Sequence, residues 1–466
     1  MDTPLLPLLR VRRGQRLHLP SHGGGPGVPQ ALRCLLQLPA GRWDLPELPE
    51  IGGPLEAEGA VVASQRAAAS AYGADHCWYG VNGATGLLQA ALLAMANPGE
   101  ALLLPRNSHR SLLQACAVAG IKPLLFDVPF QADRGHSAAV DASWLDRVFT
   151  ALDQGAHQPV GAVLVQPTYH GYAVDPQPLI QRFHQRGLPV LVDEAHGSHF
   201  LAAADSQLPQ SAVHAGADLV VHSLHKSSTG LGQTAVLWHQ GDRIDAARVS
   251  RSLGWLQTTS PSSLLLASCE ASLADWQTDA GLHRLQRRIG DARRLLQQLK
   301  PHLPLLDTND PLRLIWFTAA AGINGIVADD WFMERGLVAE LPEPGSLTFC
   351  LGLAPRRGVA RLMRRRWDGL NKALGKASPL PAFLPPPLPL LAMPAMDCGA
   401  AWRGPSRAVA WKDAVGAIAA QLVCPYPPGI PLLVPGERLD QARVTWIEKQ
   451  REFWPDQISS KVMIVA

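Results

Sequence analysis

The segment that decides the fold is ADLVVHSLHKSSTGLGQTA, residues 217–235 of the 466-residue chain. It reads as a short apolar strand that runs into Ser223, His225 and Lys226, followed by a small, polar, glycine-rich turn. An ammonium group at the end of a buried strand is costly, and the chain carries its other positive charges mostly as arginine. A desolvated lysine has a lowered pKa and can form an imine with an aldehyde. We therefore predict that Lys226 is a Schiff-base lysine.

Similar apolar runs precede this segment and alternate with helix-like stretches. They span residues 101–105, 123–126, 161–166 and 188–192, and the run at 218–221 within the segment itself completes the series. Continuous apolar strands that alternate with helices are typical of a doubly wound, mainly parallel α/β sheet. Ligands bind at the carboxyl ends of the strands in such sheets, and the polar clusters of this chain follow its strands. The sequence therefore predicts one site at that edge.

The polar clusters supply different chemical groups. Asp193 follows the strand at 188–192 and offers a carboxylate, and His109 offers a flat ring. The turn Gly83-Ala84-Thr85 opens a helix, whose free backbone N–H groups favour an anion. An aldehyde-trapping lysine, an acid for the pyridinium nitrogen, a phosphate cup and a stacking face are the requirements of pyridoxal 5′-phosphate. We therefore expect this cofactor.

On these motifs the chain resembles the fold-type-I, pyridoxal-phosphate-dependent Orn/Lys/Arg decarboxylases. The resemblance covers most of the chain and rests on several long motifs in the same order. They are Ser223-x-His225-Lys226 with Gln233, VDEAHGSHF at 192–200, RNSHRS at 106–111, PTYHG at 167–171, TTSPS at 258–262, and YPPGIP at 426–431 with Pro435-Gly436-Glu437.

The resemblance implies a role for each site residue. Lys226 would bind the cofactor's aldehyde, Asp193 would pair with the pyridine nitrogen, His196 would support Asp193, and His109 would stack on the ring. The phosphate would be held by Gly83, Ala84, Thr85, Ser223 and His225. The site would lie at a homodimer interface, where Thr259 and Ser260 would serve the neighbouring subunit.

The resemblance also implies a domain order. A large domain with a mainly parallel seven-stranded sheet between helices would span residues 61–300, and a small-domain part would span 301–377. A smaller α+β C-terminal domain would span 395–466, after a proline-rich linker at 378–394. We interpret residues 1–60, with their glycine cluster at 23–27, as an arm that packs on a neighbouring subunit.

The implied activity is decarboxylation of arginine, lysine or ornithine in a cytoplasmic enzyme of polyamine biosynthesis. The alternatives are an aminotransferase or aldolase-like enzyme on the same fold, and a cofactor-binding relative without turnover. Glu437 and Asp44 are weak candidates for the substrate's distal cation. The turn Gly83-Ala84-Thr85 lacks one hydroxyl of the family pattern, and Gly23 replaces a lysine, which puts substrate choice and rate in question.

Other features of the sequence argue against several classes of protein. The net charge is +3, without a basic stripe, which argues against nucleic acid. The N-terminus is a poor signal peptide, and apolar runs fall short of the roughly 18 residues of a membrane span. The seven cysteines are scattered, without C-x-x-C pairs, as expected for free thiols. Asp193, His196 and His199 have a metal-ligand spacing, but no distant ligand cluster supports a metal, and none is predicted.

Overall fold

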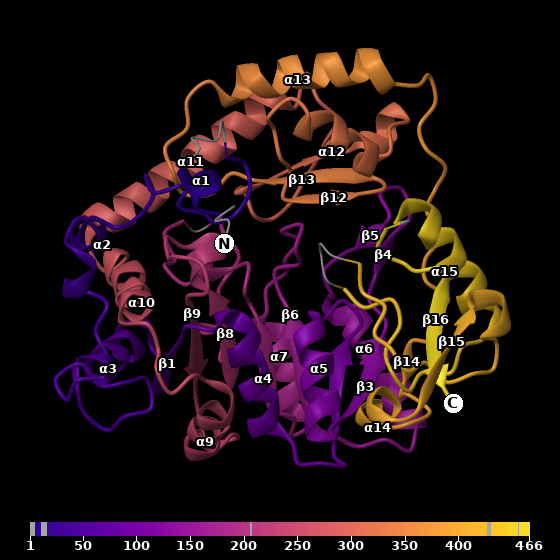
Figure 1. The fold of residues 1–466 in the computed structure, drawn as a ribbon, viewed down its shortest axis with the longest axis horizontal. Helices are drawn as coiled ribbons and strands as arrows, with labels where there is room; N and C mark the ends of the chain where they lie inside the picture. The colour runs from indigo at the N-terminus through magenta and orange to yellow at the C-terminus, as the bar shows by residue number, and fades with distance from the viewer. Residues whose placement is uncertain (1–4, 11–15, 206, 426–429, 455) are drawn as a thin grey trace.

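A computed structural model describes residues 5–10, 16–205, 207–425, 430–454 and 456–466. Figure 1 shows a large α/β domain, a small domain above it in orange, and a C-terminal domain in yellow at its side. No helix in this described part of the chain combines the length and the apolar character needed to cross a bilayer.

The large domain is built on an eight-stranded sheet with the order β1-β9-β8-β7-β6-β2-β3-β14. Strands β8, β7, β6, β2 and β3 are parallel, whereas β9 and β14 run antiparallel to their neighbours. The strands are β1 (His76–Gly80), β2 (Ala101–Pro105), β3 (Lys122–Phe126), β6 (Pro159–Val165), β7 (Val190–Asp193), β8 (Leu219–Ser223), β9 (Ala235–His239) and β14 (Leu391–Ala392). The predicted mainly parallel α/β sheet is confirmed, with β14 as an additional edge strand.

Helices cover both faces of this sheet, which explains why its strands are continuously apolar. Along β7, Val190 and Val192 belong to the core on one face, whereas Leu191 belongs to the core on the other. Side chains alternate between the faces of a strand, so a strand covered on both faces needs apolar residues at every position. The helices are α3 (Ala60–Tyr72), α4 (Gly83–Met95), α5 (Arg110–Ala119), α6 (Ala142–Gln154), α7 (Gln177–Gln185), α8 (Leu224–Ser227), α9 (Ala246–Leu256) and α10 (Ser263–Asp275).

The small domain has its own core on an antiparallel sheet of order β10-β11-β13-β12. Trp316, Phe332 and Phe349 lie in this core, and the Trp316 ring contacts Phe332 in a tilted and Phe349 in an edge-to-face arrangement. In Figure 1, α13 lies along the top of this sheet. The elements are β10 (Leu305–Leu306), β11 (Arg313–Trp316), β12 (Leu341–Glu343), β13 (Ser346–Cys350), α11 (Asp279–Leu299), α12 (Gly325–Met333) and α13 (Val359–Leu374).

The N-terminal region contains α1 (Leu5–Arg10) and α2 (Gln30–Leu36), and its glycine-rich part packs on the chain itself. The Leu17 carbonyl accepts a hydrogen bond from Cys350 N, and Ser21 N donates one to the His225 carbonyl. Its backbone groups thus pair with the small domain and with the residue that precedes Lys226, and the packing of the segment on a neighbouring subunit stays a prediction.

The proline-rich segment at 378–394 is extended and leads into the C-terminal domain. Leu391–Ala392 pairs with β3 as β14, and Phe383 N donates a hydrogen bond to the Ala132 carbonyl beside the short hairpin of β4 (Phe130–Gln131) and β5 (His136–Ser137). The C-terminal domain contains α14 (Cys398–Arg403), the paired strands β15 (Ser406–Ala410) and β16 (Lys461–Val465), and α15 (Gln441–Phe453). The YPPGIP motif at 426–431 is described in part, because residues 426–429 lie outside the described residues.

Candidate active site

A cavity of about 790 Å³ lies at the carboxyl edge of the large sheet and is bordered by all three domains. The large domain contributes Lys226, Asp193, His196 and His109 to its lining, together with Gly83–Thr85, Ser223 and His225. The small domain contributes Glu340 and Glu343, and helix α15 and the proline-rich segment line another part of the wall. The structure therefore brings together the predicted amine, acid, ring and anion-binding groups.

Lys226 lies in the short helix α8, directly after β8, and its Nζ is 3.1 Å from His196 Nε2. Burial lowers the pKa of Lys226, although the nearby Asp193 and Glu340 oppose that shift. A lysine with a lowered pKa is more often a neutral amine, the form that attacks an aldehyde. The geometry of this residue fits the predicted Schiff-base role.

His196 is buried and is held from its other side by Arg313. The Arg313 Nη2 group lies 3.0 Å from His196 Nδ1, and a guanidinium can only donate. The Nδ1 atom must therefore be the acceptor, which places the proton of the neutral ring on Nε2, facing Lys226. Burial and the charges of Lys226 and Arg313 lower the pKa of His196 well below its ordinary value, which keeps the ring neutral.

Asp193 ends β7 and is buried, yet it is only partly satisfied. Its Oδ1 accepts a hydrogen bond of 3.2 Å from Ala195 N, and its Oδ2 has no donor among the described residues. Burial raises the pKa of Asp193, whereas the charge of Lys226 opposes that rise. The adjacent Glu194 instead accepts hydrogen bonds from Ser211, Ala212 and His222. Of these two adjacent acids, Asp193 is the one left available to the cavity.

The first turn of α4 forms an anion site. Gly83 has φ +66°, a conformation that favours glycine, and a Cβ atom at this position would meet no other atom within 4 Å. The N–H groups of Ala84 and Thr85 have no acceptor among the described residues, and Asn82 provides no side-chain cap. These groups point a positive helix end at the cavity. On the opposite side, Ser223 Oγ lies 3.1 Å from His225 Nδ1.

His109 caps the start of α5 and lines the same cavity. Its Nδ1 accepts a hydrogen bond of 3.3 Å from Ser111 N, which fixes the ring. Burial, with the charge of Lys226, lowers the pKa of His109 to about 4. The ring is therefore neutral at pH 7 and can lie against a flat ligand.

The structure does not bring Glu437 or Asp44 into this cavity. Glu437 is buried between Arg106 Nη2 at 2.6 Å and Arg443 Nη1 at 3.0 Å, so its charge is already neutralised. Asp44 is exposed and does not line the cavity. Their role toward the substrate's cation stays a prediction that these positions do not support, because the carboxylates that line the cavity beside Asp193 include Glu340 and Glu343 instead.

Thr259, Ser260 and His199, which the sequence analysis singled out, lie outside the cavity lining. Thr259 and Ser260 are exposed, so their service to a neighbouring subunit stays a prediction. His199 Nε2 lies 3.0 Å from Asp310, away from Asp193 and His196. Among the described residues, Asp193, His196 and His199 therefore do not converge as a metal-ligand set.

The sequence prediction missed Arg313, Glu340 and the role of Tyr169. The Tyr169 ring lies 4.3 Å from the His196 ring, and its hydroxyl donates a hydrogen bond of 2.6 Å to Glu340. Tyr169 belonged to a recognised motif, whereas Arg313 and Glu340 lie in a stretch of short apolar runs without a motif. Nothing local in the sequence marks those two residues.

Comparisons with known proteins identify the same family over most of the chain. The family model for the major domain of Orn/Lys/Arg decarboxylases matches residues 12–308, and the model for their C-terminal domain matches residues 386–454. An arginine decarboxylase of Halalkalibacterium halodurans is 29% identical over 456 residues, which cover 93% of this chain and 90% of the relative. An arginine decarboxylase of Bacillus anthracis is 28% identical over 472 residues, which cover 97% and 93%.

The fold is also similar to a solved structure. Lysine decarboxylase A from Pseudomonas aeruginosa superimposes with a TM-score of 0.75 at 19% sequence identity, covering 96% of this chain and 78% of the other. At that identity the likeness concerns the fold alone.

Proposed function

Since this chain belongs to the Orn/Lys/Arg decarboxylase family and is an amino-acid decarboxylase, we propose that it decarboxylates arginine, lysine or ornithine with pyridoxal 5′-phosphate bound at Lys226. The observation that carries the proposal is the cavity that joins the Lys226 amine, the half-satisfied Asp193 carboxylate and the open first turn of α4.

The groups in the cavity fit the cofactor. The phosphate fits the free N–H groups of Ala84 and Thr85, with Ser223 and His225 as further donors. The unpartnered Oδ2 of Asp193 fits the protonated pyridine nitrogen, because a buried carboxylate gains from a charged donor. When bound, pyridoxal phosphate accepts the electrons that are released as the bond from Cα to the carboxylate breaks.

The chain's own residues prepare the reaction. The lowered pKa of Lys226 supplies a neutral amine, and the proton on His196 Nε2 lies beside that amine. Arg313 keeps His196 in this tautomer, and His109 covers one face of the cofactor plane. Glu340, fixed by Tyr169 and by Leu19 N, adds a negative charge near Lys226 that favours an amino-acid substrate's ammonium group.

We further propose a homodimer in a reducing compartment such as the cytoplasm. The exposed positions of Thr259 and Ser260 support a role across a subunit interface. All seven cysteines are free in the structure, which supports a reducing environment.

The experiment is to reconstitute the protein with pyridoxal phosphate and offer arginine, lysine and ornithine separately. We expect carbon dioxide and the matching amine, identified by mass, and an imine absorbance band. Lys226→Ala should lose both the band and turnover, whereas Lys372→Ala, a change of an exposed lysine, should keep both. A keto acid product would instead support an aminotransferase, and a band without turnover would support a non-catalytic relative. Absence of the band in the wild type would refute the proposal.

A further inference from the structure

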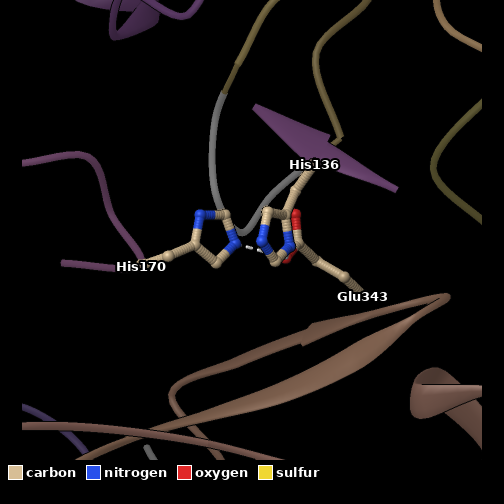
Figure 2. A group of neighbouring side chains, drawn as sticks. All are labelled: His136, His170 and Glu343. Carbon is tan, nitrogen blue, oxygen red and sulfur yellow. Dashed lines mark hydrogen bonds and ion pairs between the residues drawn. The ribbon is translucent and has the colours of Figure 1, made fainter. Parts of the chain in front are cut away.

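Glu343 is a buried carboxylate in the cavity wall that the roles above leave unused. It ends β12, is 7% exposed and lines the cavity. Its Oε2 lies 2.5 Å from His170 Nε2 and 3.5 Å from His136 Nδ1. Figure 2 shows the three side chains gathered together. Its Oε1 has no hydrogen-bond partner among the described residues. One oxygen is therefore held by the protein, and the other remains open to a ligand.

Glu343 carries a negative charge that no described lysine or arginine neutralises. Burial alone raises its pKa, but contacts with His170 and His136 outweigh burial and hold the pKa far below the ordinary value. Burial lowers the pKa of His136 to about 4, so this ring is neutral at pH 7. The largest of these contacts is with His170 at Oε2, and a cationic ligand at the open Oε1 would add a second favourable charge contact.

Glu343 lines the same cavity as Lys226, but Glu340 and not Glu343 is among the charged groups that act most on the pKa of Lys226. Tyr169 contacts His196 and Glu340, both of which lie beside Lys226. The next residue, His170, contacts Glu343. Two consecutive residues thus connect the acid near the reacting amine with an acid farther along the same wall.

Resting on the proposed function, we infer that Glu343 binds the distal cation of the substrate side chain, with His170 holding the carboxylate in position. The α-amino and α-carboxyl groups lie at Lys226, and the guanidinium or ammonium group of the side chain meets Glu343 Oε1. A chain with a neutral end leaves Glu343 Oε1 without a partner. The site therefore selects basic amino acids over neutral ones of similar length.

A metal ion is the competing occupant, because two histidines and one carboxylate can bind zinc. The geometry argues against it. The His136 and His170 rings are stacked with centroids 3.8 Å apart, and their Nδ1 and Nε2 atoms lie 3.5 Å and 2.5 Å from the same Glu343 oxygen, which leaves no room for an ion between His170 and Glu343 without moving them. The 2.5 Å separation of His170 Nε2 and Glu343 Oε2 is also that of a hydrogen bond. An organic cation bound to the free oxygen requires no rearrangement of these groups.

The test is calorimetric binding to the protein reconstituted with pyridoxal phosphate, which requires no turnover. The probes are agmatine, which ends in a guanidinium, cadaverine, which ends in an ammonium, and pentylamine, which has a neutral end. We expect Glu343→Gln to weaken agmatine and cadaverine roughly 10- to 100-fold, the effect of losing a hydrogen bond to a charged group. Pentylamine should bind the wild type and the variant about equally.

Two variants serve as controls. Glu334→Gln removes the same charge from an exposed position of the small domain and should change no affinity. Glu343→Asp keeps the charge at a shorter reach and should keep a preference for cationic amines over pentylamine, even if Glu343→Gln does not fold. Unchanged agmatine binding in Glu343→Gln, an equal loss for pentylamine, or no such preference in Glu343→Asp would overturn the inference. Binding of one Zn²⁺ that depends on Glu343 would overturn it as well.

The two proposals can fail separately. A wild type that prefers cationic amines through Glu343 but releases no carbon dioxide would refute the decarboxylation and support the cation site. A wild type that decarboxylates arginine, with an unchanged KM in Glu343→Gln, would support the decarboxylation and refute the cation site.

Discussion

Replacement of Glu437 by glutamine should weaken the attachment of the C-terminal domain. Glu437 joins Arg106, which follows β2, to Arg443 in α15, and the three side chains are only 5–7% exposed. Its second oxygen accepts a hydrogen bond of 2.9 Å from Val434 N. Glu437→Gln keeps the shape but leaves two buried guanidinium groups without a counter-charge. Breaking a buried ion pair from one side costs about 3–5 kcal/mol, and we expect a loss of that size.

The measurement is denaturant unfolding followed by tryptophan fluorescence, because Trp411 and Trp446 report on the C-terminal domain. The first transition should move to lower denaturant in Glu437→Gln. Glu448→Gln, on the exposed face of the same helix, should change stability by less than about 0.5 kcal/mol. A loss below about 1 kcal/mol for Glu437→Gln, or a gain, would refute the reasoning.

The ion pairs of Glu437 with Arg106 and Arg443 also predict how the free energy of unfolding depends on pH. Burial raises the pKa of Glu437, but Arg106 and Arg443 outweigh burial and hold it below the ordinary value. A carboxyl with a lowered folded-state pKa stabilises the protein above its unfolded pKa, and this contribution disappears as the pH falls through the folded value. The difference between wild type and Glu437→Gln should therefore be full at pH 7 and shrink only under acid conditions. An equal difference at every pH would contradict a charge effect.

Two further outcomes follow from the site. Arg313→Leu should lower kcat roughly 10- to 100-fold and shift the pH profile of kcat, because Nδ1 of His196 loses its hydrogen-bond donor. Arg313→Gln, which can still donate, should keep part of the activity. An unchanged pH profile in Arg313→Leu would refute the positioning role of Arg313. His109, with a pKa of about 4 in the folded protein, should make the cofactor-free protein less stable as the pH falls from about 6.5 to 4, by at most about 1.4 kcal/mol per pH unit. The denaturant midpoint should therefore depend less on pH in His109→Gln than in the wild type. An equal pH dependence of the two midpoints would contradict the lowered pKa of His109.

The sequence predicted the part of the site that lies on the large sheet. Asp193 and Lys226 each follow a strand that is apolar at nearly every position, and strand ends in a parallel sheet meet at one edge. Local patterns were sufficient there, because the same short segment defines both the strand and the functional residue.

The rest of the site depends on contacts between distant segments. Arg313 is 117 residues from His196 in the chain, and Glu340 is 171 residues from Tyr169. No periodic pattern encodes such a pairing. The burial of Glu437 could not be predicted, because acidic residues are mostly exposed and its burial follows only from the two arginines that the tertiary fold places beside it. The short strand Leu391–Ala392 could not be predicted among so many prolines.

That short strand has a consequence for aggregation. Without it, β3 (Lys122–Phe126) would be the outermost strand of a long, apolar sheet, and unpaired backbone groups on such an edge recruit strands from other molecules. The antiparallel pairs of Leu391 with Phe126 and Ala392 with Leu125 cover the end of β3 that lies nearest the cavity. The proline-rich segment thus acts as a guard against edge-to-edge association, and the proline residues around it offer few N–H groups with which a further strand could pair.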